Sequence, residues 1–192
     1  IVPGLDGHDV ITEIRKEPEH SHNFGGAWHF DLSFQTSPPV AAVLVAREIP
    51  ATGGDTLWAN QYLAYEALPS GVRAEVDKLV ATHSSHLSFN QYLDAIQVST
   101  ARHPLAPVHP TTGRRHLFAN PVSIESFIGR TAAESRELLD FLVEHATSEA
   151  FQCRHRWQQD DVVVWDNRAT MHRAMNDYQG KRRVMHRIGI RG

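Results

Sequence analysis

Apolar and polar runs divide the chain into several predicted strands and three predicted helices. The apolar run VAAVLVAREI predicts a buried strand, and a second strand is expected near LVATHSS. The clearest helix is ESRELLDFLVEHA, because Thr131 and Glu134 form a capping box before it. Two shorter helices are predicted over Asn60 to Leu68 and Ser70 to Lys78.

From Phe151 onward the pattern is entirely β. The alternating stretch AFQCRHRW predicts a strand with Cys153 and Trp157 on one face, so we expect Cys153 in the core. Two further strands are predicted at VVVWDN and RRVMHRIGI, with RATMHRAMNDYQGK as the loop between them. The stretch HPLAPVHPTTGRRHLFAN reads as two extended pieces around a PTTG turn. Many strands and few helices predict a mainly β fold with flanking helices, as a sandwich or barrel.

Length and composition indicate the number of domains and the class of protein. The 192 residues, 41% hydrophobic and 21% charged, fit a single domain over residues 1–192. The chain has no apolar run of about 18 residues, so we expect no membrane span. One cysteine indicates a reducing compartment, and we therefore expect a cytoplasmic protein. The sequence opens at IVPGLDGHDV without an initiator methionine or a signal-peptide pattern, so we expect further residues before it.

The net charge of −3 is unevenly distributed. Residues 151–192 contain nine Arg and Lys against four Asp and Glu, a balance of +5, so the first 150 residues carry −8. These basic residues alternate with apolar ones and form no cluster, which argues against a nucleic-acid partner. A basic lining for a small anion is the alternative that we keep.

The motif WHFD carries the first candidate chemistry. In an extended strand His29 and Asp31 point to the same side, about 7 Å apart at Cα, so both can reach one ion. The competing interpretation is a His–Asp hydrogen bond on a solvated strand face. A distant third residue, His172 in WDNRATMHRA, would complete the two-histidine, one-carboxylate set of non-haem Fe(II) sites.

The other polar candidates are interpreted as structural. The chain has thirteen histidines, and we expect most of them on the surface or satisfied in the core. We expect His83 and His86 at a solvated strand end, and His186 on the outward face of the last strand. Ahead of His172, the residues predicted to form the scaffold of the turn are Trp165, Asp166 and Asn167.

Four segments resemble the signature blocks of the taurine dioxygenase family: WHFDLSF, PATGGDTLWAN, WDNRATMHRA and QGKRRVMHR. The resemblance runs from about Trp28 to Arg187. Members of that family are Fe(II)- and 2-oxoglutarate-dependent dioxygenases that act on sulfonates, alkyl sulfates and aryloxyalkanoates. The resemblance therefore implies a double-stranded β-helix, or jelly roll, with Fe(II) as cofactor and with 2-oxoglutarate and O₂ as co-substrates.

The resemblance also assigns roles to individual residues. It implies that His29, Asp31 and His172 are the iron ligands, and that Thr56 and Arg183 hold the distal carboxylate of 2-oxoglutarate. A guanidinium can bind a carboxylate bidentately, and a hydroxyl can satisfy a remaining lone pair. Without the resemblance, Thr56 reads as a turn or helix-start residue.

Strand alternation points to a second inward arginine. In RRVMHRIGI, Arg187 lies on the same face as Arg183, about 13 Å further along the strand. A second inward cation implies a second anion, and the resembling family uses this position for the acid group of the substrate. An ion pair with a protein carboxylate is the alternative. The predicted function is hydroxylation of a small anionic substrate, by a protein that we expect to form homo-oligomers.

The sequence departs from the family pattern in three places. The N-terminal portion that contributes to the family's substrate pocket lies outside this sequence, and the lid region between Ser84 and His103 is short. Gly25 and Gly26 replace the asparagine of the taurine enzymes, which argues against taurine as the substrate. Two alternatives stay open: a jelly-roll hydrolase that activates water on zinc, and a non-catalytic barrel that binds a small acid. The arginine clamp argues against the first, and the intact triad argues against the second.

Overall fold

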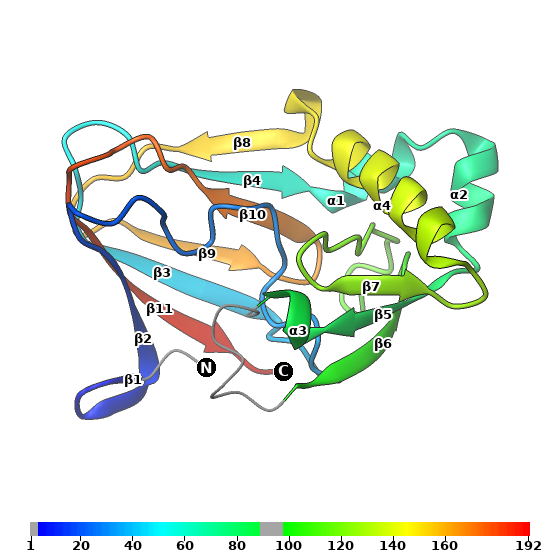
Figure 1. The fold of residues 1–192 in the computed structure, drawn as a ribbon, viewed down its shortest axis with the longest axis horizontal. Helices are drawn as coiled ribbons and strands as arrows, with labels where there is room; N and C mark the ends of the chain where they lie inside the picture. The colour runs from blue at the N-terminus through cyan, green and yellow to red at the C-terminus, as the bar shows by residue number, and fades with distance from the viewer. Residues whose placement is uncertain (1–3, 89–97) are drawn as a thin grey trace.

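The computed structural model describes residues 4–88 and 98–192, and its architecture is mainly β, with the longer helices on one side (Figure 1). The largest sheet is antiparallel, with the strand order β1-β2-β11-β3-β9. These strands are β1 (Gly4–Leu5), β2 (His8–Lys16), β11 (Arg183–Ile190), β3 (Ala41–Glu48) and β9 (Val162–Asp166). Three of them were predicted from the sequence. The polar pattern of β1 and β2 gave no signal.

A second antiparallel sheet packs against the first. Its order is β10-β4-β8, with β10 (Thr170–Ala174), β4 (Thr56–Asn60) and β8 (Gln152–His155). The core between the two sheets contains Trp58 and Trp157 facing Leu44 and Met185. The segment from Arg168 to Lys181 is therefore not simply a loop, because β10 lies within it. Its residues Thr-Met-His-Arg-Ala carry too few apolar side chains to reveal a strand by pattern alone.

The helices pack on a third sheet beside the other two. This sheet has the order β6-β5-β7, with β6 (Thr100–Pro104), β5 (Val80–Ser84) and β7 (Ile124–Phe127). The core shared with the helices includes Leu68, Ala81, Leu105 and Leu142. Figure 1 shows the longer helices on the side away from β1 and β2. The helical segments are α1 (Gln61–Glu66), α2 (Ser70–Val76), α3 (Ser85–Ser88), α4 (Ala132–Ala146) and the 3₁₀ turn η2 (Glu149–Phe151).

Local sequence signals explain where the helices begin. The predicted capping box before α4 is confirmed, because the Thr131 hydroxyl accepts from Glu134 N and the Glu134 carboxylate accepts from Thr131 N. Asn60 likewise caps α1 by accepting from the backbone N–H groups of Tyr62 and Leu63. Both predicted short helices are confirmed.

Cys153 is exposed, so its predicted place in the core is wrong. It pairs with the buried Trp58 across β8 and β4, and therefore lies on the correct face of the sheet. However, β8 is an edge strand, and the side chain lies beyond the cover of the opposite sheet. Alternation identifies the face of a strand but not its distance from the edge.

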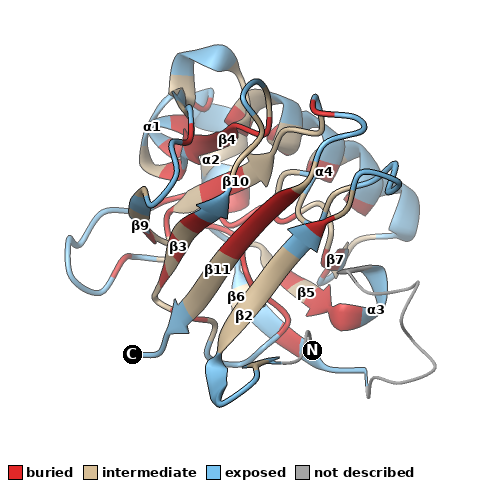
Figure 2. Cartoon of the chain, turned by 90° about the vertical axis from the view of Figure 1, so that its left-hand side faces the viewer, coloured by how far each residue is buried: buried red, intermediate tan, exposed pale blue. Residues whose placement is uncertain are grey.

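Burial changes along β11, the central strand of the largest sheet (Figure 2). The strand is buried at Arg183, Val184 and Met185, becomes partly exposed near His186 and ends exposed at Ile190. His186 lies on the outward face and pairs with Glu13 of β2 at 3.5 Å, as expected of a structural residue. The buried half of β11 therefore brings a charged residue, Arg183, into the interior.

His83 corrects another expectation, because it is fully buried and does not lie at a solvated strand end. It lies on β5, the middle strand of its sheet, where its ring stacks on Phe118 and its Nδ1 lies 3.0 Å from the hydroxyl of Ser33. His86, on α3, is exposed as expected. Burial lowers the pKa of His83 to about 3, and burial also lowers the pKa of His116 to about 4.

These two buried histidines predict a loss of stability in mild acid. Each is neutral when folded and titrates near 6.5 when unfolded, so the unfolded chain binds more protons below pH 6.5. We expect the free energy of unfolding to fall by up to about 1.4 kcal/mol per pH unit for each histidine as the pH drops from 6.5 toward 4. Urea unfolding at pH 7, 6 and 5, with EDTA present, measures this slope. The His83→Leu variant should lose one histidine's share, and an equal slope in both proteins would contradict the assignment.

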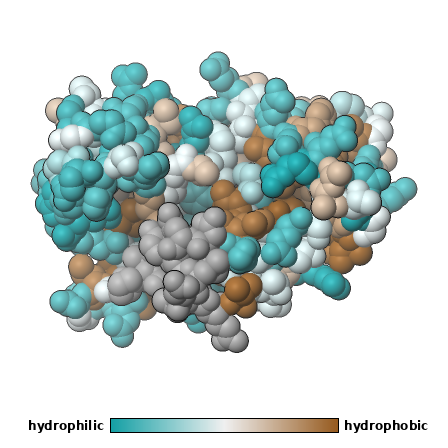
Figure 3. Space-filling view, in the orientation of Figure 1, coloured by the Kyte–Doolittle hydropathy of each residue, from teal (hydrophilic) through white to brown (hydrophobic). Residues whose placement is uncertain are grey.

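The visible surface in Figure 3 mixes hydrophilic and hydrophobic residues, with hydrophilic side chains covering most of the left side. Large hydrophobic side chains that are exposed include Val162 and Val164 on β9 and Phe141 on α4. Within the described parts of the chain, no helix is both long enough and apolar enough to cross a membrane.

Candidate active site

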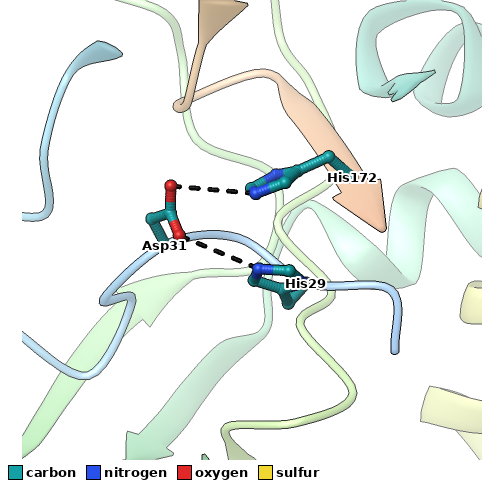
Figure 4. A group of neighbouring side chains, drawn as sticks. All are labelled: His29, Asp31 and His172. Atoms are coloured by element: carbon teal, nitrogen blue, oxygen red, sulfur yellow. Dashed lines mark ion pairs between the residues drawn. The ribbon is translucent and has the colours of Figure 1, made fainter. Parts of the chain in front are cut away.

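His29, Asp31 and His172 converge from two distant parts of the chain (Figure 4). One nitrogen of each histidine and one oxygen of the carboxylate all lie within 4.8 Å of one another. The Nε2 atoms of His29 and His172 each lie 3.8 Å from a different oxygen of Asp31. Two backbone hydrogen bonds of 2.9 Å join His29 to His172 in an isolated β-bridge, which fixes their separation.

The segment that carries His29 and Asp31 is not the regular strand that the H-x-D pattern predicted. It forms a single bridge at His29 and enters a turn at Asp31, followed by Leu32 with φ of 51°. The two side chains nevertheless face the same side, as expected. Asp31 and His172 are each only 7% exposed, so the interpretation as a solvated strand face is wrong.

Asn167 holds the backbone of Asp31 in place. Its Oδ1 accepts from Asp31 N at 2.9 Å, and its Nδ2 donates to the carbonyl oxygens of Asp31 at 3.1 Å and Pro39 at 2.9 Å. Its neighbour Asp166 accepts from Arg168 N at 2.9 Å and lies 2.8 Å from Nε2 of His109. The predicted scaffold role of Asp166 and Asn167 is confirmed, although Asn167 secures Asp31 and not its own turn.

The electrostatics of the triad suit a divalent cation. Nδ1 of His29 lies 2.8 Å from the carbonyl oxygen of Ala27, so it donates there and leaves Nε2 facing Asp31 with a free lone pair. Burial alone would raise the pKa of Asp31, but Arg187, His172 and His29 outweigh it and keep the pKa below its usual value. Burial, and then the neighbouring His29, lower the pKa of His172 to about 3. The group is thus an anionic carboxylate with a neutral His172 beside it.

One pocket collects all of the predicted site residues. Its lining includes the triad together with Thr56, Arg183 and Arg187. Apolar side chains form much of the remaining wall, so the charged groups lie in a partly dry cavity. The main apolar contributors are Ile14, Phe24, Leu44, Trp165 and Met185.

Arg183 and Thr56 form a polar end of this pocket. Arg183 is 4% exposed, and its Nε and Nη2 atoms have no hydrogen-bond partner within residues 4–88 and 98–192. Burial lowers the pKa of Arg183, against the opposing effects of Tyr178 and Asp55. The hydroxyl of Thr56 accepts from Trp157 Nε1 at 2.9 Å, which leaves its own hydrogen free to donate. A buried guanidinium with free donors beside a hydroxyl is a ready site for a carboxylate.

The glycines of the TGGDT loop make room for this arginine. Gly54 has φ of 75°, and a Cβ there would lie 3.1 Å from Cδ and 3.2 Å from Nε of Arg183. Its N–H donates to Asp177 Oδ1 at 2.7 Å, which ties the loop to the segment before β11. A side chain at Gly54 would be strained and would press on the guanidinium.

Arg187 lies on the same face of β11 as Arg183, as alternation predicted, and its Nη2 lies 2.6 Å from Asp31 Oδ2. The expected alternative of an ion pair with a protein carboxylate is thus present in the structure. The partner, however, is a member of the triad.

The sequence matches the model of a known protein family. Residues 5–188 match the model described as "Taurine catabolism dioxygenase TauD, TfdA family". The chain belongs to this family. The matched range includes every residue of the pocket lining, so the predicted resemblance is confirmed.

Several proteins are similar to this chain over most or all of its length. An "Alkylsulfatase" of Acinetobacter baylyi is 36% identical over 205 residues, covering 100% of this chain and 63% of that protein. An "Alpha-ketoglutarate-dependent sulfate ester dioxygenase" of Pseudomonas putida is 33% identical, covering 100% and 67%. A crystal structure of a taurine dioxygenase from Burkholderia xenovorans has a TM-score of 0.83 at 36% identity, covering 100% and 65%. The structure of AAD-2 in complex with Mn(II) and N-oxalylglycine has a TM-score of 0.81 at 32% identity, covering 88% and 69%. This chain thus spans about two thirds of the length of these relatives.

Two of the departures from the pattern of the TauD, TfdA family can be located. Gly25 has φ of 74°, and a Cβ there would lie 3.2 Å from Cε1 of His29, so an asparagine would force the histidine ring to move. The carbonyl oxygen of Gly25 also accepts from Ala174 N at 2.8 Å. The predicted short lid between Ser84 and His103 includes residues 89–97, which lie outside the described residues.

Sequence reasoning missed several residues of this site. Ile14 lines the pocket from β2, a strand that the pattern did not reveal. Trp165 was assigned to the scaffold, but it lines the pocket and its ring lies 4.8 Å from that of His172. Alternation in VVVWDN could have found Trp165, since Trp165 and Val163 face inward while Val162 and Val164 are exposed.

Proposed function

We propose that this chain carries the catalytic centre of an Fe(II)- and 2-oxoglutarate-dependent dioxygenase that hydroxylates a small anionic organic molecule. The observation behind this proposal is one pocket that contains a His–Asp–His group and two inward arginines. A hydrolase needs the metal site but has no use for a buried arginine that binds the carboxylate of a co-substrate. A simple acid-binding barrel would need the arginines but not the triad.

The proposed iron ligands are His29, Asp31 and His172. Their donor set, two imidazoles and a carboxylate, is typical of Fe(II) sites that keep three open positions. The hydrogen bond from His29 to Ala27 and the anionic state of Asp31 prepare both residues to ligate. When bound, Fe(II) would supply the activation of O₂ and the oxidative decarboxylation of 2-oxoglutarate to succinate and CO₂.

The proposed role of Arg183 and Thr56 is to bind the distal carboxylate of 2-oxoglutarate. The free donors of Arg183 need an anion, and the Thr56 hydroxyl can add a further hydrogen bond. Trp157 holds the hydroxyl, and Gly54 lets the guanidinium approach the pocket. This end of the site would orient the co-substrate so that its other end reaches the triad.

Further residues around the proposed iron site would position its ligands and exclude water from it. Asn167 keeps the Asp31 backbone fixed, so the carboxylate has little freedom to turn away. Leu44, Trp165 and Met185 are buried and line the pocket, which limits the access of water. A substrate carbon held against this wall would be hydroxylated. A hydroxyl next to a sulfate, sulfonate or ether oxygen gives an unstable product, which would release sulfate, sulfite or an alcohol.

The strand connections favour a jelly roll. The chain passes from β2 in the large sheet to the His29 bridge on β10, and then to β3 in the large sheet and β4 in the other. After β8 it alternates again through β9, β10 and β11. We propose that residues 1–192 form one such catalytic domain within a longer protein. The homo-oligomeric state and the cytoplasmic location remain predictions.

The substrate class follows from Arg187, which we propose binds the acid group of an alkyl sulfate, sulfonate or aryloxyalkanoate. The two relatives named for sulfate ester chemistry favour the first of these. We expect a panel of such acids, assayed by substrate-dependent succinate formation, to contain active substrates. The neutral analogue of the best acid should react at least about tenfold less efficiently, the effect of losing one charge-assisted contact. Equal turnover of acid and neutral analogue would contradict the anion-binding role of Arg187.

A further inference from the structure

Arg187 faces two parts of the pocket at once. Its Nη2 lies 2.6 Å from Asp31 Oδ2, and the two side chains are only 15% and 8% exposed. The opposite oxygen, Asp31 Oδ1, faces His29. One carboxylate therefore contacts both the arginine and the histidines of the proposed iron site.

This contact is short but does not have the geometry of a hydrogen bond. Asp31 Oδ2 and the Nε and Nη2 atoms of Arg187 are buried, and none of them has a hydrogen-bond partner in the described part of the chain. Nη2 is held by the charge of Asp31, but Nε contacts no acceptor in the described residues and stays available to a second anion. A purely structural ion pair would be expected to use these donors fully.

The charge of the pocket depends on what is bound. The pocket lining contains two arginines, Arg183 and Arg187, and one carboxylate, Asp31, so the lining alone carries one excess positive charge. A divalent ion in the triad raises that excess to three, and the two carboxylates of 2-oxoglutarate return it to one. A substrate monoanion would then neutralise the site. In a partly dry pocket, repulsion between Arg187 and the metal is weakly screened.

We propose that Arg187 couples the metal site to the substrate-anion site, so that each ligand strengthens the binding of the other. A metal ion takes up part of the charge of Asp31, weakens its attraction for Arg187 and frees the guanidinium for the anion. The anion in turn offsets the repulsion between Arg187 and the metal. This inference rests on the proposed function, in which the triad holds a metal and Arg187 holds the substrate. Because the coupling is thermodynamic, it must have the same size when measured from either ligand.

Mn(II) and n-hexyl sulfate test this coupling without turnover, because no 2-oxoglutarate is added. The paramagnetic resonance signal of free Mn(II) gives the dissociation constant of the metal with and without n-hexyl sulfate. We expect n-hexyl sulfate to tighten Mn(II) binding about tenfold, and n-hexanol to have no effect. Calorimetry should show Mn(II) tightening the binding of n-hexyl sulfate by the same factor.

The Arg187→Met variant removes the charge and keeps most of the apolar stem. We expect its coupling factor to fall to about one, which is the value for independent sites. The matched control is Arg47→Met, because Arg47 lies on β3 outside the pocket, is half exposed and pairs with Asp160. It should keep the full coupling. If Arg187→Met does not fold, as judged by circular dichroism, the reciprocal titrations on the unmodified protein still decide whether coupling exists.

Each remaining outcome points to a different failure. A coupling factor that is unchanged in Arg187→Met would overturn the role of Arg187. Mn(II) binding that ignores n-hexyl sulfate in the unmodified protein would overturn the coupling and leave the proposed metal site intact. No Mn(II) binding to the unmodified protein would overturn the proposed function itself.

Discussion

Replacing Asp31 by alanine should abolish Fe(II)-dependent consumption of 2-oxoglutarate while leaving the fold intact. The change removes the only carboxylate of the proposed ligand set, and we expect a loss on the order of a thousandfold or more, since the bound metal contributes several kcal/mol to such reactions. The fold should survive because Asn167 binds only the backbone of Asp31, and alanine keeps that backbone, but the loss of the ion pair with Arg187 should lower the free energy of unfolding. Succinate formation and Mn(II) binding measure the two consequences.

The matched control for this prediction is Asp160→Ala. Asp160 is an exposed carboxylate that pairs with Arg47 away from the pocket, so its removal should leave activity unchanged. Far-ultraviolet circular dichroism and urea unfolding would verify that both variants fold. Full activity in Asp31→Ala would show that the triad does not hold the metal.

The second large effect is expected at Arg183. The Arg183→Ala variant loses a charge-assisted, bidentate contact in a partly dry site, worth about 2–4 kcal/mol. That loss corresponds to roughly 30- to 1,000-fold weaker binding of 2-oxoglutarate. Thr56→Val should cost less, about 1 kcal/mol, because only a neutral hydrogen bond is removed. Calorimetric titration of 2-oxoglutarate into the Mn(II)-loaded protein separates these effects from turnover.

Arg182 provides the matched control, since it precedes Arg183 in the chain but faces away from the pocket. It forms ion pairs with Glu17 and Glu48 at the surface, so Arg182→Ala should bind 2-oxoglutarate normally. An unchanged affinity in Arg183→Ala together with a loss in Arg182→Ala would mean that the wrong arginine was assigned.

The parts of the fold that could be predicted are those with a strong local signal. The capping box at Thr131 defines the start of α4, and the continuous apolar run at Ala41–Glu48 defines β3. The local sequence pattern does not reveal a strand that forms because of its partners in the sheet. Polar β2 is a strand because it pairs with β11, and β10 is a strand because it pairs with β4. Cross-strand partners are not visible in a local pattern.

In the candidate site too, some residues could be predicted from the sequence and others depend on tertiary contacts. His29, Asp31 and His172 could be proposed from their residue types and spacing, whereas Arg183 was assigned from the family resemblance and Arg187 from strand alternation relative to Arg183. The support around them could not be deduced, because Asn167 reaches Asp31 across 136 positions of the sequence and Trp157 reaches Thr56 across 101. The contact between Arg187 and Asp31 likewise depends on how a turn meets a strand. Spacing and the family resemblance identified these side chains, and the fold showed which of them are in contact.

The most direct test of the proposed function is a visible absorption spectrum of the protein with Fe(II) and 2-oxoglutarate under anaerobic conditions. We expect a weak visible charge-transfer band that requires both additions, because 2-oxoglutarate must chelate the iron held by the triad. The band should be missing in Asp31→Ala and should need much more 2-oxoglutarate in Arg183→Ala. If the unmodified protein binds Fe(II) but gives no band at saturating 2-oxoglutarate, the chain is not a 2-oxoglutarate-dependent dioxygenase.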